Sequence, residues 1–176
     1  MLTIHSNPPD EERLVAELEQ LGVRYLSRQS AYQAKRVRPP QKLLADLVRQ
    51  PSSRVRTALI AVLLAHPEYG GVVPSVVLSL PTAEQWTLKL FYTAAVLLQK
   101  EYAARLQIFL GEDWCWLPDW FSKELNLPSA APGEQLRALA HLHQQETGIV
   151  LNWAGTYDNA ARHLLHRWEL ERTWNQ

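Results

Sequence analysis

Cysteine is almost absent from this chain: Cys115 stands alone, so no disulfide can form within it. Small secreted domains commonly depend on disulfides, and a chain without them is typical of a reducing compartment. The first residues, MLTIHSNPPDEE, have neither a basic start nor a following apolar run, as a secretory signal would. The longest apolar run, ALIAVLLA at 58–65, is far below the roughly 18 residues of a membrane span. We therefore predict a soluble, cytoplasmic protein.

Motifs that hold nucleotides or metals are also absent. The chain has only seven glycines and neither a GxGxxG nor a GxxxxGK[ST] pattern. His163 and His166 share a helical face, but no set of Cys, Asp or Glu residues at ligand spacing accompanies them. Cys115 has no neighbouring base that would activate it, and we expect it to be buried and inert. The sequence predicts no cofactor, no metal and no enzymatic activity.

What the sequence does contain is helical periodicity along most of its length. Residues 70–81 are ambiguous, because their β-branched run would suit a strand, but their end favours a short buried helix. We predict a single all-α domain, 1–176, with about seven or eight helices in a compact bundle. An irregular stretch at about 23–40, rich in Lys and Arg, interrupts the helices. Besides a short helix within 70–81, helices are expected near 7–22, 41–50, 52–66, 82–110, 117–126, 131–148 and 156–174.

The segment 82–110 is the longest of these predicted helices. Its apolar residues recur at spacings of three and four, and a second apolar stripe runs beside the first. A helix that is apolar over most of its circumference is buried on several sides. We expect 82–110 to be the central helix of the bundle.

Two short stretches resemble known families. Residues 51–80 look like one HEAT-type helix pair, which implies a protein-interaction repeat. Arg137 and His143, in RALAHLH, are similar to the Arg-x4–6-His motif of HEPN ribonucleases, which implies a helical RNase. Thirteen arginines and six histidines produce about one such spacing by chance, and positions six apart do not share a helical face. His143 also aligns with apolar positions, so we expect a hydrogen-bonded, partly buried side chain.

Charge is balanced overall, with 18 basic and 18 acidic residues, but it is segregated along the chain. Residues 24–56, here called the basic segment, hold nine Lys or Arg residues against one acid, Asp46. The flanking parts are each net acidic. Such segregation is typical of a surface for nucleic acid or another anionic partner. The alternative is internal pairing with the acids of the same chain or of a second copy.

We predict a non-catalytic binding or accessory protein whose basic segment contacts nucleic acid, with DNA and RNA left open. Arg54 and Arg56 carry particular weight, because they fall in the first turn of a helix, where cations are disfavoured unless an anion is bound. The candidate contacts are Arg24, Arg28, Lys35, Arg36, Arg38, Lys42, Arg54 and Arg56.

The alternative function is a protein–protein adaptor or a regulatory subunit of the toxin–antitoxin kind. Three of the seven tryptophans lie in DWCWLPDWF, within the Trp-rich segment 111–121. Large aromatic rings usually anchor cores or interfaces. Trp114, Trp116 and Trp120 are therefore the candidate contacts for a protein partner or for self-association.

Overall fold

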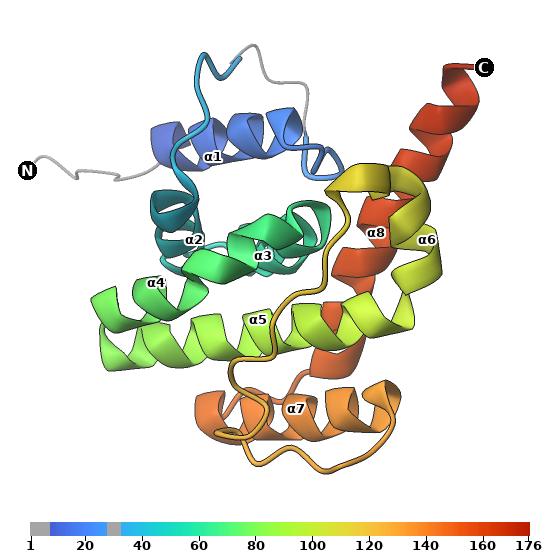
Figure 1. The fold of residues 1–176 in the computed structure, drawn as a ribbon. Coiled ribbons are helices and arrows are strands. Elements are labelled where there is room, and N and C mark those ends of the chain that lie inside the picture. The colour runs from blue at the N-terminus through green and yellow to red at the C-terminus, as the bar shows by residue number, and fades with distance from the viewer. Residues whose placement is uncertain (1–7, 28–32) are drawn as a thin grey trace, which may run out of the picture.

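The computed structural model describes residues 8–27 and 33–176, which form eight α-helices and no β-strand (Figure 1). The prediction of a compact all-α bundle is confirmed. The α-helices are α1 (Pro8–Gln20), α2 (Pro40–Val48), α3 (Ser53–Ala65), α4 (Val73–Ser79), α5 (Thr82–Glu101), α6 (Ala103–Leu110), α7 (Pro132–Thr147) and α8 (Trp153–Trp174); two short 3-10 helices are η1 (Pro67–Val72) and η2 (Gly111–Asp113). Of residues 70–81, ambiguous in the sequence, 70–79 are helical and belong to the two elements η1 and α4.

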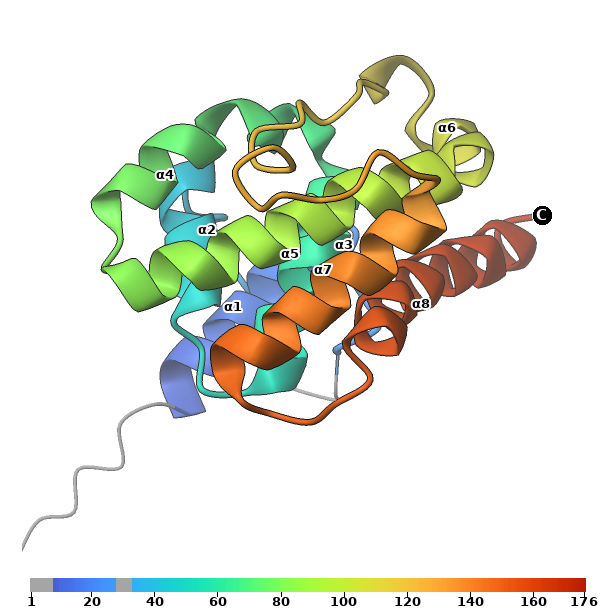
Figure 2. The ribbon, with the colours of Figure 1, turned by 90° about the horizontal axis from the view of Figure 1, so that it is seen from below.

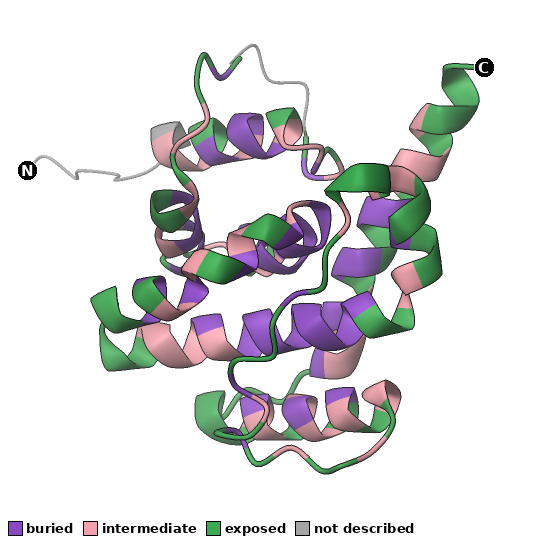
Figure 3. Cartoon of the chain, in the orientation of Figure 1, coloured by how far each residue is buried: buried purple, intermediate pink, exposed green. Residues whose placement is uncertain are grey.

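Helix α5 occupies the centre of the bundle. It lies between α3 and α7 and also contacts α8 and α4 (Figures 1 and 2). Every residue from Leu90 to Gln99 is buried, as the continuous purple stretch of α5 in Figure 3 shows. A helix covered on several sides is what its apolar circumference predicts.

The predicted helix 82–110 is divided in two, because the chain bends at Tyr102 (φ −107°, ψ 15°) between α5 and α6. Beyond the bend, α6 turns to run beside α8 (Figure 1). The Tyr102 hydroxyl donates a hydrogen bond to Asp158 of α8 at 2.6 Å, and Arg105 pairs with Glu169 at 2.8 Å. These long-range contacts stabilise a bend that helical periodicity alone does not indicate.

The helix predicted at 117–126 does not form; residues 117–120 have no regular secondary structure, and 121–126 make bends and turns. The Trp-rich segment is instead attached to α5 by side-chain hydrogen bonds. The buried Gln99 amide donates to the carbonyl of Cys115 and accepts from the backbone N–H of Leu117, both at 2.8 Å. The hydroxyl of Tyr92 donates to the carbonyl of Pro118 at 2.6 Å. The segment thus lies along α5 without a helix of its own.

Residues 51–80, which resemble a HEAT-type helix pair in sequence, contain the helices α3 and α4 with η1 between them. The two halves, Ser53–Ala65 and Pro67–Ser79, are bent by 109°, so they do not make an antiparallel hairpin. Helix α4 packs mainly on α2 and α5. No single helix of the described chain has the length and apolar composition of a membrane span, although this bent pair meets both criteria when its halves are taken together.

Candidate functional site

Arg38, a predicted nucleic-acid contact, is largely buried and is surrounded by acids. Its guanidinium donates to Glu17 at 2.7 Å and to Asp46 at 2.6 Å, and it lies 3.6 Å from Asp10. Although burial opposes the charge, hydrogen bonds and attraction from Glu17 and Asp46 raise the pKa of Arg38 above its usual value. The internal-pairing alternative therefore holds for this residue, which joins the chain before α2 to α1.

Two more of the candidate contacts also have acidic partners. Arg24 pairs with Glu171 at 2.6 Å, and Lys42 pairs with Asp46 at 3.1 Å. Arg28 lies outside the described residues. Three of the seven candidate contacts in the described chain thus form ion pairs, and the unpaired positive charge lies on the other four, Lys35, Arg36, Arg54 and Arg56.

A groove lies between α1, the residues leading into α2, and the start of α2. Its volume is about 660 Å³. Arg13, Lys35 and Arg36 line it, are exposed, and have no ion-pair partner among residues 8–27 and 33–176. The full lining is Asp10, Arg13, Glu17, Gln33, Lys35, Arg36, Arg38 and Lys42, five basic side chains against two acidic ones. The two acids of the groove, Asp10 and Glu17, already pair with Arg38. The charges of Arg13, Lys35 and Arg36 are therefore available to a ligand from solvent.

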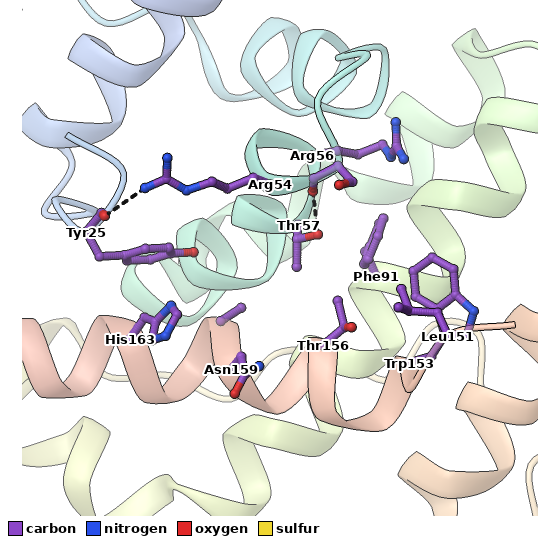
Figure 4. Close-up of a pocket in the computed structure, with 12 residues that line it drawn as sticks. Tyr25, Arg54, Arg56, Thr57, Phe91, Leu151, Trp153, Thr156, Asn159 and His163 are labelled. Carbon is purple, nitrogen blue, oxygen red and sulfur yellow. Dashed lines mark hydrogen bonds between the residues drawn. The ribbon is translucent and has the colours of Figure 1, made fainter. Parts of the chain in front are cut away.

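A separate pocket of about 250 Å³ lies between the first turn of α3 and the first three turns of α8 (Figure 4). Tyr25 and His163 lie at one end of it, and Phe91, Leu151 and Trp153 at the other. The remaining lining residues are Ser53, Arg54, Arg56, Thr57, Thr156, Asn159 and Ala160. No Asp or Glu lines this pocket, although it contains two arginines.

The sequence predicted how the α3 side of this pocket is built. Arg54 and Arg56 lie in the first turn of α3, as expected, and Ser52 caps this helix by accepting a hydrogen bond from the backbone N–H of Val55 at 3.4 Å. Arg54 donates to the carbonyl of Tyr25 at 3.4 Å, and Arg56 donates to the carbonyl of Gln50 at 2.7 Å. Within residues 8–27 and 33–176, both guanidinium groups therefore bind neutral acceptors, and no carboxylate of these residues pairs with either.

The other residues of the two sites were missed from sequence. Arg13 belongs to an acidic stretch, and Trp153 and Asn159 lie on α8, about a hundred residues from α3. Only the helical contact between α3 and α8 brings these residues next to Arg54 and Arg56. No signal in a single sequence indicates which faces of two distant helices will meet.

The three tryptophans of the Trp-rich segment differ in exposure. Trp114 is half-buried, whereas Trp116 is 56% exposed and Trp120 is 45% exposed. Trp120 nevertheless donates its indole N–H to the carbonyl of Gly70 at 3.0 Å. Cys115 between them is exposed, so the expectation that it is buried was wrong; the extended backbone turns it outward. Partial desolvation raises the pKa of its thiol, which disfavours the reactive thiolate.

His143 is buried and hydrogen-bonded, whereas Arg137 is exposed on the same helix. The imidazole stacks on Trp153 with 3.6 Å between ring centroids, and its Nδ1 is hydrogen-bonded to the Tyr157 hydroxyl at 2.5 Å. Burial, with a smaller contribution from the charge of Arg56, lowers the pKa of His143 to about 4. The pair resembling the HEPN motif is therefore not brought together. In the described part of the chain, no three His, Cys, Asp or Glu residues are placed to hold a metal ion.

We expect His143 to make the fold sensitive to acid. An unfolded chain protonates this histidine near pH 6.5, whereas the folded protein resists protonation down to about 4. Between these values the unfolded state binds more protons, so stability is full above the window and falls as the pH drops through it, by up to about 1.4 kcal/mol per pH unit. Urea unfolding of the wild type and His143→Gln at several pH values should show a smaller loss in the variant. Parallel pH profiles would contradict this assignment.

Comparison with known proteins finds no matching family model, no similar characterised sequence and no similar solved structure. The class is thus defined by the fold alone: an all-α bundle with a basic groove at one place and an acid-free pocket at another.

Proposed function

We propose that the chain is a non-catalytic, cytoplasmic binding protein whose groove contacts nucleic acid. One observation carries the proposal: Arg13, Lys35 and Arg36 line a groove and lack acidic partners among the residues the structure describes. Phosphate backbones are bound chiefly by such cations, whose counterion release drives association. The arginine-rich composition, thirteen Arg against five Lys, suits phosphate because a guanidinium presents a fork of donors.

The proposal differs from the sequence-based one in which residues make contact. Arg24 and Arg38 are assigned to structure, because each is paired with an acid. Arg13 is added, since it faces the same groove as Lys35 and Arg36. The surface is small, so we expect moderate affinity, a preference for charge over sequence, and no cleavage of the bound strand.

The test is binding of a fluorescein-labelled single strand of about 12 nucleotides, within the usual site size, followed by anisotropy. DNA and RNA versions are compared at low salt. Replacing Arg13, Lys35 and Arg36 by Gln should weaken binding by about tenfold or more, because three charge-assisted phosphate contacts are lost. The matched control replaces Lys100, Arg137 and Arg172 by Gln; these are likewise two arginines and one lysine, all exposed and without a described acidic partner. Equal affinities for the two triple variants would contradict the proposal.

A second candidate function is an adaptor that binds a protein through the Trp-rich segment. Its support is the exposure of Trp116 and Trp120 on a backbone fixed by Gln99. Aromatic residues of this kind are enriched at protein interfaces. The anisotropy assay tests whether the Trp-rich segment takes part in strand binding. If the groove alone contacts the strand, Trp116→Ser should leave strand affinity unchanged.

A further inference from the structure

The pocket between α3 and α8 is a second site, distinct from the groove. None of the groove residues lines it, and its chemistry is different, because aromatic and hydroxyl side chains accompany its arginines. We infer that this pocket binds a nucleotide: a planar base that carries a phosphate group. The inference does not depend on strand binding in the groove.

The net positive charge of the pocket favours binding of an anion. Arg54 and Arg56 contribute two positive charges, and no carboxylate lines the cavity. Their protein partners are the carbonyls of Tyr25 and Gln50, each of which occupies one nitrogen of the guanidinium. An arginine has five N–H donors, so both side chains keep donors for a phosphate.

The aromatic side chains at the two ends of the pocket favour binding of a planar, partly apolar group. Phe91 and Trp153 are 2% and 7% exposed, so they form a rigid apolar wall at one end and present only a small part of their rings to the cavity. Tyr25 at the other end is fixed by its edge-to-face contact with His163, at 5.4 Å between centroids. Aromatic rings that are held in place in this way stack well on nucleobases.

The polar side chains of the middle section suit the edge of a base or a sugar. Thr57 donates its hydroxyl proton to the carbonyl of Ser53, and Thr156 donates to the carbonyl of Asn152, the N-cap of α8; both oxygens remain available as acceptors. Asn159 is exposed and offers both a donor and an acceptor at the same place (Figure 4). The volume of about 250 Å³ limits the occupant to a single nucleotide.

A free mononucleotide and a nucleotide within a strand share this chemistry, and calorimetry can separate the two sources. Adenosine and uridine 5′-monophosphate are titrated into the protein, with adenosine alone and inorganic phosphate alone as partial ligands. We expect either monophosphate to bind at least about tenfold more tightly than either part, because the base and the phosphate are bound at different places. A short strand that competes with the monophosphate would place a nucleotide of the strand in the pocket.

The variant for this test is Arg54→Gln with Arg56→Gln, which should weaken monophosphate binding by at least about tenfold. Arg54→Gln alone, at an exposed position, is measured in parallel in case the double variant does not fold. The groove variant Arg13→Gln/Lys35→Gln/Arg36→Gln should bind monophosphate as the wild type does. Absence of monophosphate binding to the wild type, or binding that Arg54→Gln leaves unchanged, would overturn the inference without affecting the groove.

Discussion

Leu98→Asp is expected to abolish the folded state. Leu98 is fully buried in the middle of α5, the helix that contacts α3, α7 and α8. The substitution removes its packing, worth about 2–5 kcal/mol, and places a carboxylate where no described partner exists, at a cost of several kcal/mol more. Together these losses are comparable to the whole stability of a typical domain, about 5–15 kcal/mol.

The measurement is circular dichroism with thermal unfolding, and we expect no cooperative transition for Leu98→Asp. The control is Lys100→Asp, which places the same carboxylate at an exposed position of the same helix and should cost at most about 1 kcal/mol. A Leu98→Asp protein with full helical signal and a sharp transition would show that α5 is not the centre of the bundle.

Arg38→Gln is expected to lower the free energy of unfolding by about 3 kcal/mol. The side chains of Arg38 and Glu17 are only 11% and 10% exposed, so removing the guanidinium leaves buried acids without their counter-charge. Breaking a buried ion pair in this way typically costs about 3–5 kcal/mol. The expected value is at the lower end, because Asp10 is more exposed and Lys42 still pairs with Asp46.

Urea unfolding measures this loss, and Arg36→Gln is the matched control. Arg36 is two residues away, exposed and unpaired in the described structure, so its replacement should change stability by no more than about 0.5 kcal/mol. Equal unfolding midpoints for the two variants would mean that the network around Arg38 contributes nothing to the fold.

Local signals in the sequence predicted much of the fold. Helical periodicity located α3, and the apolar circumference of α5 indicated its central position. The bend at Tyr102 was not predictable, because it depends on Asp158 and Glu169 of α8, more than fifty residues away. A helix was predicted at 117–126 and does not form; hydrogen bonds from the distant Gln99 fix the chain at Cys115 and Leu117 instead.

The candidate site shows the same division between local and distant information. The sequence indicated that the basic segment carries unusual charge, and it left internal pairing open. It could not decide which cations are paired, because Arg38 reaches Glu17 on α1 and Asp46 on α2, while its near neighbour Arg36 reaches no acid in the described chain. Partner choice is set by the packing of helices, which a charge count does not contain.

The salt dependence of strand binding tests the central claim most directly. For a single strand, the logarithm of the association constant falls with the logarithm of salt concentration by about 0.7 per phosphate contact. Between about 50 and 200 mM salt, the wild type should therefore show a slope steeper by about 2 than the variant with Arg13, Lys35 and Arg36 replaced by Gln. The control variant at Lys100, Arg137 and Arg172 should keep the wild-type slope. A wild-type protein that binds no strand at low salt, or whose slope the groove replacements leave unchanged, would contradict the account.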